Sequence, residues 1–374
     1  MTAPLIKGYC PGALRPMMSG DGLVVRVRPF AGRLTVAQAT GIATLSDQFG
    51  NGIIDLSARA NVQLRGVTSD SHGPLIDGLR ALDLIDASEG IERRRNLIVT
   101  PFWENGDQTK ALADRLTEAL STSDAPDLPH KFGFAIDTGP QPVLQAASAD
   151  IRLERGHDGT LLLIAANMPG GQQVSTDTCI DAAMSLARWF MTTRRDETRM
   201  AALLHTTAPP PGFTSPRQNP HVAATPGSTP QGTLCGFAFG QTTSETFAQL
   251  AAFGPLRLTP WRMILVEGAS VLPSTNGIIT DPADPLLRIT ACTGAPGCTQ
   301  AQGDTRHTAR SLAPHLKPRQ TLHISGCAKG CAHPNKAPLT LTATRQGFNL
   351  IHAGRAGDPP AATALSTQDI IKAL

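Results

Sequence analysis

The amino-acid sequence predicts an α+β fold that one chain builds twice. Three observations support this: a strand–helix–strand pattern present in both halves, a hairpin with a glycine turn that follows it in both, and a Pro-rich stretch between them. A pattern that recurs in the same order indicates internal duplication. The 374 residues allow two or three domains, and a content of 41% hydrophobic and 17% charged residues allows large buried cores.

The first copy begins with an alternating segment over residues 22–30, where Arg26 and Arg28 share one face and apolar residues occupy the other. A period of two residues predicts a strand. A helix is expected from Thr35, a suitable N-cap residue, to Phe49, where a Gly-Asn-Gly sequence ends it. A second strand region is expected over residues 53–66, in which polar and apolar residues again alternate.

A related pattern returns over residues 256–268. Aligned without gaps, Leu56 meets Leu258 and Gly66 meets Gly268. The later segments repeat in the same order, which strengthens the prediction of a duplication. The first-copy and second-copy segments are strands 96–101 and 287–291, strands 131–136 and 321–325, hairpins 151–164 and 339–351, and closing helices 176–203 and 367–374.

The stretch between the copies is dense in Pro, Gly, Ser and Thr and has little capacity for helix or strand. The predicted organisation therefore has five parts: a first half-domain (1–70), a first α/β module (71–206), a linker (207–232), a second half-domain (233–275) and a second α/β module (276–374).

Four of the seven cysteines form a C-x5-C pair and a C-x3-C pair in the second module: Cys292, Cys298, Cys327 and Cys331. Glycines in both loops let the backbone approach a bound group closely, and four thiolates are the usual ligands of a [4Fe–4S] cluster. Structural zinc, disulfides and unligated thiols remain alternatives. The first spacing fits a zinc knuckle poorly, and nothing else indicates an oxidising compartment.

Basic residues on the predicted strands of the first half indicate a site for a polyanionic small molecule, because arginine binds carboxylates through two parallel hydrogen bonds. The alternative is that each arginine is solvated or paired with an acidic residue. The set comprises Arg15, Arg26, Arg28, Arg33, Arg59, Arg65, Arg93, Arg94, Arg95 and Lys131.

Other features narrow the function. The net charge of +3 is too small to indicate nucleic acid or a membrane as a partner, and no apolar run is long enough to cross a bilayer. We expect a cytoplasmic protein, because no signal peptide is visible and the cysteine count is odd. No phosphate-binding glycine motif occurs, so electrons are expected from an external donor, such as a reductase, a ferredoxin or a flavodoxin.

Several segments together resemble the nitrite/sulfite reductase family, in conserved order from about residue 8 to residue 350. They are Arg26-Val-Arg28 with Gly32, Ser57-Ala-Arg59 with Gln63, Arg95-Asn96-Leu-Ile, Pro129-His130-Lys131-Phe132, and the two cysteine pairs. The resemblance implies ferredoxin-like half-domains with two three-layer α/β modules. It also implies a [4Fe–4S] cluster whose fourth cysteine touches the iron of sirohaem. Four matched positions contact sirohaem or its oxyanion in that family: Arg28, Arg59, Arg95 and Lys131.

Within that family the segments 8–22 and 58–66 are more similar to the precorrin-3B synthase branch of cobalamin biosynthesis. A second lysine that the reductases use around their oxyanion is Gly133 here. This branch implies oxygen-dependent hydroxylation of precorrin-3A at C20, with closure of the ring-A acetate to a γ-lactone. The resemblance suggests Lys131 and Arg95 as catalytic residues, and as substrate-binding residues Arg15, Arg26, Arg28, Arg59, Gln63, Arg95 and Lys131.

Two further points stay open at this level. A mononuclear non-haem iron is a candidate second cofactor, but the sequence does not assign its ligands, although His130, His323 and His333 lie near the motifs. Two other functions remain: a sirohaem-dependent sulfite or nitrite reductase, and a cluster-bearing redox sensor or electron carrier that only binds a tetrapyrrole.

Overall fold

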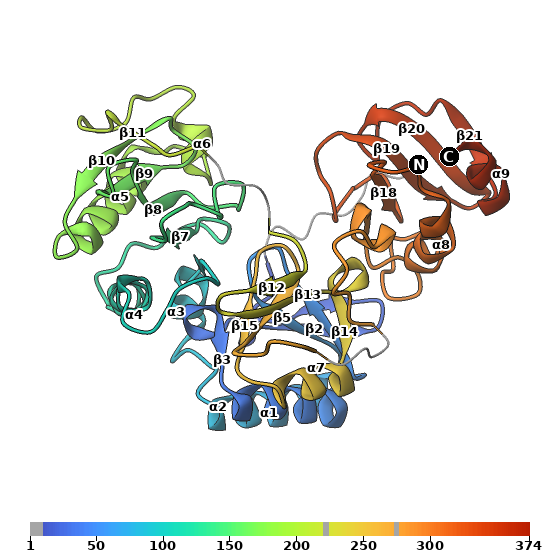
Figure 1. Cartoon of the computed structure of the whole chain (residues 1–374), viewed down its shortest axis with the longest axis horizontal. Coiled ribbons are helices and arrows are strands. Elements are labelled where there is room, and N and C mark those ends of the chain that lie inside the picture. The colour runs from blue at the N-terminus through green and yellow to red at the C-terminus, as the bar shows by residue number, and fades with distance from the viewer. Residues whose placement is uncertain (1–9, 220–223, 273–276) are drawn as a thin grey trace.

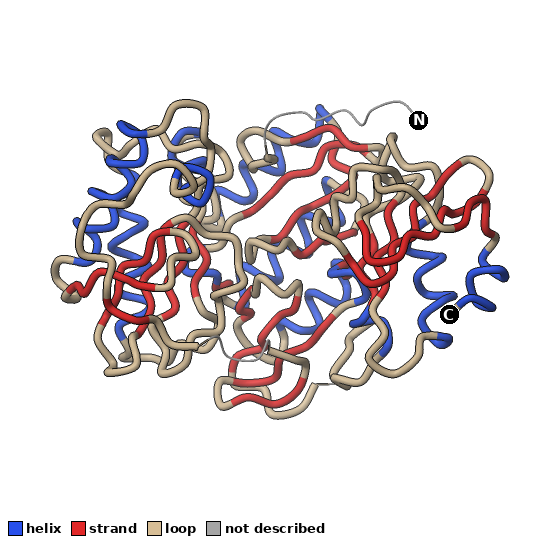
Figure 2. The backbone as a smooth tube through the Cα atoms, turned by 90° about the horizontal axis from the view of Figure 1, so that it is seen from above, coloured by secondary structure: helices blue, strands red, loops and turns tan. Residues whose placement is uncertain are grey.

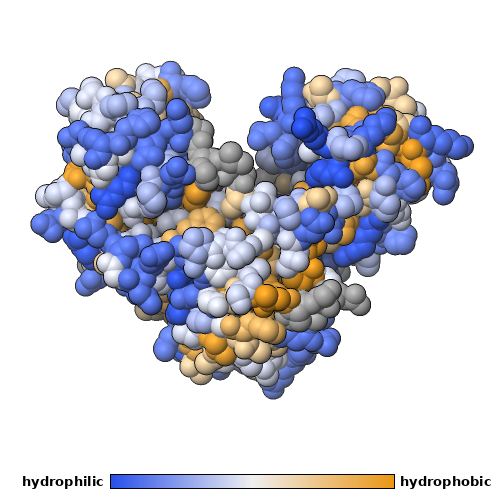
Figure 3. All heavy atoms as spheres, viewed as in Figure 1, coloured by the Kyte–Doolittle hydropathy of each residue, from blue (hydrophilic) through white to orange (hydrophobic). Residues whose placement is uncertain are grey.

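A central body carries two lobes that stand apart from each other in this computed structural model (Figures 1 and 3). The structure describes residues 10–219, 224–272 and 277–374. Parts of three sequence-based predictions lie outside these ranges: the first residues of the segment 8–22, four residues of the linker, and the boundary between the second half-domain and the second module. Seen from above, the strands of the central body lie between the strands of the two lobes (Figure 2).

The central body contains two five-stranded sheets of the same design. The strands of the first sheet are, in spatial order, β1 (Met17–Ser19), β2 (Gly22–Val27), β5 (Val62–Val67), β4 (Ile53–Leu56) and β14 (Gln241–Thr243). Those of the second are β12 (Gly227–Thr229), β13 (Gly232–Gly236), β16 (Met263–Glu267), β15 (Leu256–Leu258) and β3 (Arg33–Leu34). Each sheet therefore takes its fifth strand from the other copy.

The predicted repeat register is confirmed by the strand pairing. Leu56 pairs with Val62 in the first sheet, and Leu258 pairs with Ile264 in the second. Residues 57–61, expected as part of a strand, form the turn between β4 and β5 instead. In this turn Ala60 adopts a positive φ of 53°, which a regular strand does not allow.

A buried ion pair crosses the two central strands of each sheet, with its charges reversed between the copies. In the first sheet Arg65 Nη1 lies 3.1 Å from Asp55 Oδ2. In the second sheet the equivalent positions hold Glu267 and Arg257, with 3.1 Å between Oε1 and Nη2. The copies thus share the position of the pair but place its charges on opposite strands.

Helices α1 (Val36–Phe49), α2 (Ser69–Ala81) and α7 (Ser244–Ala251) lie beneath the two sheets (Figure 1). The helix predicted from Thr35 is confirmed. The Thr35 side chain accepts from the N–H of Gln38, and the Gln38 side chain accepts from the N–H of Thr35. This reciprocal cap satisfies donors that a helix start leaves unpaired. Apolar residues of both copies, Ile42 and Phe247 among them, share one core beneath the sheets.

The first lobe is a six-stranded sheet whose helices pack on one face. Its strands are, in spatial order, β11 (Ser215–Pro216), β10 (Gly170–Val174), β9 (Leu161–Ala165), β8 (Ile151–Arg155), β7 (Phe134–Asp137) and β6 (Leu97–Val99). Its helices are α4 (Gln108–Ser121) and α5 (Cys179–Thr193), with α3 (Glu89–Arg94) and α6 (Met200–Leu203) nearby. On the other face Ile98 and Ala135 join the core of the central body, so the sheet lies between two apolar layers.

The second lobe repeats this design with five strands: β17 (Ile289–Ala291), β18 (Leu322–Ser325), β19 (Ala337–Thr344), β20 (Gly347–Gly354) and β21 (Ala362–Leu365). Its helices are α8 (Thr305–Leu312) and α9 (Thr367–Ala373), and they share a core with the sheet. Short 3₁₀ turns complete the chain at Phe30–Gly32, Ala238–Gly240, Pro285–Arg288 and Ala313–His315. No helix in the described ranges is both long and apolar enough to cross a bilayer.

Two expectations need correction. The closing helix over 176–203 is divided into α5 and α6, because Arg194 is extended and the N–H of Arg195 bonds to the Glu197 carboxylate. The linker 207–232 is also more ordered than its composition predicts. Part of it forms β11, which pairs with β10, and part forms β12, which pairs with β13.

Candidate functional site

The two cysteine loops leave the carboxyl ends of neighbouring parallel strands. Ala291 of β17 pairs with Ile324 of β18, and each strand runs directly into one loop. The N–H of Cys292 donates to the Ile324 carbonyl at 3.2 Å, and the N–H of Gly326 donates to Cys292 Sγ at 3.1 Å. Parallel strands end at the same edge of a sheet, so both cysteine pairs arrive together.

The four thiols lie close enough to affect one another. Burial raises the pKa of Cys331, Lys329 acts in the opposite direction, and the thiols of Cys327, Cys292 and Cys298 add to the rise. All four cysteines are free. A Cβ atom added at Gly326 would lie 2.7 Å from Ala301 Cβ, so glycine allows this loop to pack closely against the segment that follows Cys298.

The donor set therefore fits an iron–sulfur cluster, for which four thiolates are the usual ligands. A site for a single metal ion is a different matter. Within residues 10–219, 224–272 and 277–374, no group of three His, Cys, Asp or Glu side chains is gathered to hold one ion. The described residues thus do not provide a ligand set for the mononuclear iron.

The first copy has the same backbone geometry without the sulfur. The N–H of Thr100 donates to the Ile136 carbonyl at 2.9 Å, the counterpart of the bond from Cys292 to Ile324. Phe102 follows in this loop and stacks on Trp261, with ring centroids 6.0 Å apart. In the first copy this loop therefore packs an aromatic side chain against the second copy.

A cleft of about 460 Å³ lies beside the cysteine loops, between the central body and the second lobe. Its volume falls within the range of small-molecule sites. Cys292 and Cys331 contribute to its wall. Its polar and charged lining residues from the other elements are Ser19, Arg26, Asp55, Ser57, Arg59, Gln63, Arg65, Arg262, Thr293 and Arg306, together with Cys10.

Arg26 and Arg59 line this cleft, and neither forms an ion pair within the described part of the chain. Arg26 donates through Nε and Nη2 to Gln63 Oε1, at 3.1 and 2.7 Å. Arg59 donates to the Lys131 carbonyl at 3.0 Å, and its Nη1 is buried without a partner. Burial lowers the pKa of Arg26 to about 10 and also lowers that of Arg59. Such groups have donors available for an anionic ligand.

Two predicted site residues lie elsewhere. Arg95 is 4% exposed, and its Nε and Nη2 each donate to the Asp86 carboxylate at 2.7 Å. Arg28 is 7% exposed and donates to the Glu92 carbonyl, away from the cleft. The expectation that Arg28 projects into the cleft needs correction, because the chain leaves β2 at Val27 and turns this side chain towards α3. Both arginines have structural partners.

The remaining basic residues are spread over several surroundings. Arg15 pairs with Glu89 at 3.2 Å, and both side chains are about half exposed. The Lys131 side chain is exposed, and its carbonyl accepts from Arg59, a cleft residue. Arg65 lines the cleft but is held by Asp21 and Asp55. The other members of the predicted set bind carboxylates or carbonyls outside the cleft: Arg33 with Glu267, Arg93 with Asp127, and Arg94 with Leu120 and Thr122.

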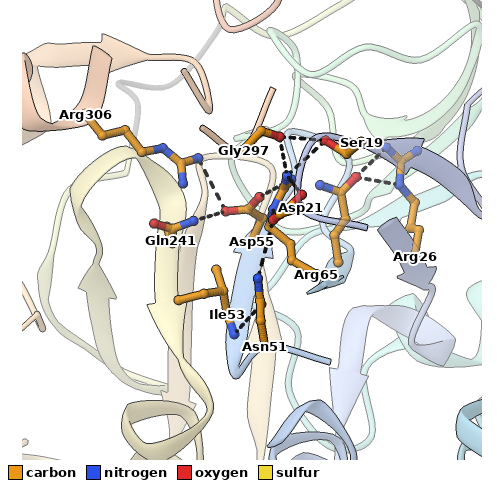
Figure 4. A network of polar contacts seen from close by, with 11 residues as sticks. Ser19, Asp21, Arg26, Asn51, Ile53, Asp55, Arg65, Gln241, Gly297 and Arg306 are labelled. Carbon is orange, nitrogen blue, oxygen red and sulfur yellow. Dashed lines mark hydrogen bonds and ion pairs between the residues drawn. The ribbon is translucent and has the colours of Figure 1, made fainter. Parts of the chain in front are cut away.

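Sequence reasoning missed Arg262 and Arg306, which come from the second copy. Arg306 Nη2 donates to Asp55 Oδ1 at 3.3 Å, within a network that also holds Arg65 and Gln241 (Figure 4). The gap-free alignment of the repeats pairs Arg262 with Ala60, and this difference between the copies is the signal that the sequence contains.

The histidines near the motifs do not form a ligand set. His323 is 1% exposed, and burial, with a further effect of His333, lowers its pKa to about 4. The two rings lie 5.5 Å apart. His130 lies in a separate small cavity with Arg28, and burial lowers its pKa also. His323 is therefore neutral at neutral pH.

Comparisons with known proteins agree with this fold. Residues 15–82 match the nitrite/sulfite reductase ferredoxin-like half domain. The solved structure of Mycobacterium tuberculosis NirA superposes with a TM-score of 0.62 at 16% identity, covering 94% of this chain and 79% of that one. The duplicated half-domains and the lobes built on them define the nitrite/sulfite reductase fold.

Sequence relatives assign the chain within that class. A precorrin-3B synthase from Sinorhizobium sp is 31% identical over 96% of this chain and 86% of its own length. A ferredoxin–nitrite reductase from Synechococcus elongatus is 25% identical over 92% and 82%. The chain belongs to the precorrin-3B synthase family, and its relatives are oxidoreductase-type enzymes.

Proposed function

We propose that this protein catalyses the precorrin-3B synthase reaction, the oxygen-dependent hydroxylation of precorrin-3A at C20 with closure of the ring-A acetate to a γ-lactone. One observation carries the proposal: the cleft beside Cys292 and Cys331 holds guanidinium groups without carboxylate partners in the described ranges, Arg26, Arg59 and Arg262. A tetrapyrrole with acetate and propionate groups supplies the missing carboxylates. Membership of the precorrin-3B synthase family supports the same substrate.

Overall, the reaction adds one oxygen atom of O2 to the substrate and releases the other as water. It therefore consumes two electrons and two protons, which an external donor of the reductase, ferredoxin or flavodoxin type supplies. A [4Fe–4S] cluster on Cys292, Cys298, Cys327 and Cys331 supplies one-electron transfer at the edge of the cleft when it is bound. The described residues gather no set of three His, Cys, Asp or Glu side chains around a single iron.

The chain itself binds and orients the substrate. Arg26 and Arg59 present fixed donors to carboxylates on one wall, and Gln63 fixes the plane of the Arg26 guanidinium. Lys131 is exposed next to Arg59 and is our candidate for moving a proton during turnover. Arg95 is not retained as a catalytic residue, because Asp86 neutralises it in a buried pair.

A sirohaem-dependent sulfite or nitrite reductase is the second candidate, because Cys331 lines the cleft and the fold is shared with those enzymes. Gly133 counts against it. A Cβ atom there would lie 2.7 Å from Asn96 Nδ2 and 3.1 Å from Arg59 Nη1, so Arg59 fills the space that a second basic side chain needs. Sirohaem absorption bands, together with methyl viologen-linked sulfite or nitrite turnover, would favour this reading.

The deciding experiment starts from anaerobically purified protein with its iron and sulfide measured. Precorrin-3A, oxygen and a reductant are added, and the product mass is recorded. A gain of one oxygen atom supports the proposal. If the tetrapyrrole binds tightly but its mass does not change, the protein is a tetrapyrrole-binding redox protein and not this enzyme.

The cluster has its own test. Cys298→Ala and Cys327→Ala should each lose the visible absorption and EPR signal of the cluster, whereas Cys235→Ala, which removes a buried thiol bonded to the Ile264 carbonyl, should keep both. Full retention of both signals in the variant lacking all four cysteines would contradict the assignment.

A further inference from the structure

Arg262 stands between two cavities. The cleft shares Phe239, Gly240 and Arg262 with a side pocket of about 400 Å³. The side pocket is mostly apolar, and Trp261 and Met263 flank Arg262 on its wall. A guanidinium at this boundary faces polar groups in the cleft and aromatic and aliphatic groups behind it.

Both copies share the backbone conformation at the position of Arg262, but they differ in its side chain. Arg262 has a φ of 60°, and Ala60, its counterpart in the first copy, has a φ of 53°. Both copies therefore use the same left-handed turn, which is unfavourable for a residue with a Cβ atom. The first copy places a small buried residue there, whereas the second copy places a long cation at the cleft.

A neighbouring glycine makes room for this side chain. A Cβ atom added at Gly240 would lie 2.7 Å from Cβ and 2.8 Å from Cδ of Arg262. At Gly32, its counterpart in the first copy, the nearest atom is the Leu258 carbonyl oxygen at 3.6 Å. Both glycines have a φ of 69°, so only Gly240 also carries a steric demand. In the second copy, glycine at position 240 is therefore needed for Arg262 to lie where it does.

The positive charges of Arg262 and Arg306 are not fully matched by the Asp55 carboxylate in this part of the cleft. Arg262 has no hydrogen bond or ion pair within the described part of the chain, while burial and the nearby Arg306 lower its pKa and Asp55 opposes them. Arg306 reaches Asp55 Oδ1 at 3.3 Å, and its Nε is buried without a partner. Arg65 binds Asp55 as well, so this carboxylate is already shared. Two neighbouring cations therefore have donors left for a further anion.

We propose that Arg262 and Arg306 form a second carboxylate-binding subsite in the cleft, on the wall away from Arg26. Its ligand is an acetate or propionate carboxylate of the tetrapyrrole, so this inference rests on the proposed function. Figure 4 draws Arg306 and Arg26 on opposite sides of the Asp55 and Arg65 network. A macrocycle with carboxylates around its whole edge can meet both walls at once, and a ligand charged on one edge only cannot.

The test measures binding of uroporphyrin, a stable tetrapyrrole with an acetate and a propionate on every ring, by fluorescence titration of the holoprotein. Arg262→Gln and Arg306→Gln are each expected to weaken binding about tenfold to a hundredfold, as loss of hydrogen bonds to charged groups does. Both should also reduce the dependence of affinity on salt concentration. Arg262→Lys keeps the charge but not the paired donors, and an intermediate loss is expected.

Arg319→Gln is the matched control. Arg319 also has a left-handed backbone, with a φ of 66°, but it is exposed and does not line the cleft. The affinity of the Arg319→Gln variant for uroporphyrin should equal that of the wild type. Iron content and circular dichroism show whether each variant is folded. If Arg262→Gln does not fold, the subsite is tested with Arg262→Lys and Arg306→Gln.

The outcomes separate this inference from the proposed function. If Arg59→Gln weakens binding but Arg262→Gln, Arg262→Lys and Arg306→Gln behave like Arg319→Gln, the subsite is overturned and the cleft stands. If wild-type protein does not bind uroporphyrin, both the subsite and the proposed substrate class are overturned.

Discussion

Arg59 and Arg95 differ in what neutralises them. Arg95 is buried with Asp86, which binds it through two hydrogen bonds, so its charge is satisfied inside the protein. Arg59 contacts a carbonyl and a hydroxyl, and no described carboxylate pairs with it. A guanidinium held by neutral acceptors at a cleft keeps a net charge for a ligand, whereas one in a buried ion pair does not.

This difference predicts opposite effects of the same substitution. Arg59→Gln should weaken uroporphyrin binding about tenfold to a hundredfold and leave thermal stability close to that of the wild type. Arg95→Gln should reduce stability by roughly 3–5 kcal/mol, because it leaves Asp86 buried without its partner. Titration and thermal unfolding of both variants check this. If the Arg95→Gln protein is stable but binds uroporphyrin more weakly, Arg95 contributes to ligand binding and not to stability.

A buried carboxyl in the first lobe predicts a pH effect. Asp137 is 1% exposed and accepts from the N–H groups of Val143 and Leu144, each at 2.6 Å. Burial raises its pKa to about 7, so the folded protein holds this proton while the unfolded chain has lost it. The contribution of Asp137 to the free energy of unfolding therefore falls as pH rises from about 4 to about 7 and is constant above that range.

Asp137→Asn removes this titration. Relative to the variant, the wild type should lose roughly 2–3 kcal/mol between about pH 5 and pH 8, as linkage requires for such a shift. Asp77→Asn, at a side chain that is 77% exposed, is the control and should follow the wild type. Parallel pH profiles for Asp137→Asn and the wild type would show that Asp137 has an ordinary pKa.

At the residue scale, sequence identified the cysteines better than the arginines. Spacing and neighbouring glycines are local properties, and both pairs indeed lie at adjacent strand ends. Whether an arginine is neutralised depends on partners far along the chain, as for Arg65, held by Asp21 and Asp55. Local alternation showed that Arg26 faces the site but could not show that Arg28 turns towards Glu92.

At the scale of elements, the turn between β1 and β2 supports one cysteine loop. The N–H of Gly20 donates to the Gly297 carbonyl at 3.2 Å, and Ser19 Oγ donates to the same oxygen at 2.8 Å. A Cβ atom at Gly20 would lie 2.6 Å from the Pro296 carbonyl oxygen and 3.0 Å from the Cys298 nitrogen. The hairpin of the central body therefore fixes the position of the loop that carries Cys298.

Gly20→Ala should consequently reduce cluster content, because the loop must move to admit the methyl group. Gly73→Ala is the matched control: Gly73 lies in α2 with nothing within 4 Å of the added atom, and alanine favours a helix. Iron and sulfide per chain are measured for both after anaerobic purification. Equal iron in Gly20→Ala and Gly73→Ala would mean that the hairpin does not support the loop.

The predicted elements are confirmed where apolar periodicity extends over a whole segment, as in α1 and the strand β2. Short elements were missed. β12 consists of Gly227–Thr229 and forms through pairing with β13, a contact that composition does not reveal. The break between α5 and α6 depends on the Glu197 carboxylate and not on a proline or glycine, the signals that sequence reading uses.

At the scale of the whole molecule, each copy completes the other. β3 belongs to the first copy but pairs with β15 of the second, and β14 belongs to the second copy but pairs with β4 of the first. The exchanged residues also join the buried ion pairs: Arg33 Nε lies 2.7 Å from Glu267 Oε2, and Gln241 donates to Asp55 Oδ1 at 2.9 Å. The duplication was predictable from repeated patterns, but the exchange was not, because strands of two or three residues carry no such pattern.

We expect that neither half folds alone. Residues 1–206 and 207–374 produced separately should aggregate, since each lacks a strand and part of the shared core, whereas the two produced together should form a soluble complex. As a control, full-length protein with a protease site in the 207–219 segment should remain one species in gel filtration after cleavage. Cooperative unfolding of residues 1–206 alone would contradict the expectation.

The exchange of β14 also affects how the chain emerges from the ribosome. About 185 residues separate Leu56, at the end of β4, from Gln241, at the start of β14. At a synthesis rate of roughly 5–20 residues per second, β14 is made about 10–40 s after β4, the strand with which it pairs. During that time a nascent sheet presents unpaired backbone groups along one side, which can pair with another nascent chain. Slower translation, or crowding of ribosomes on one message, should therefore lower the soluble yield through the first sheet.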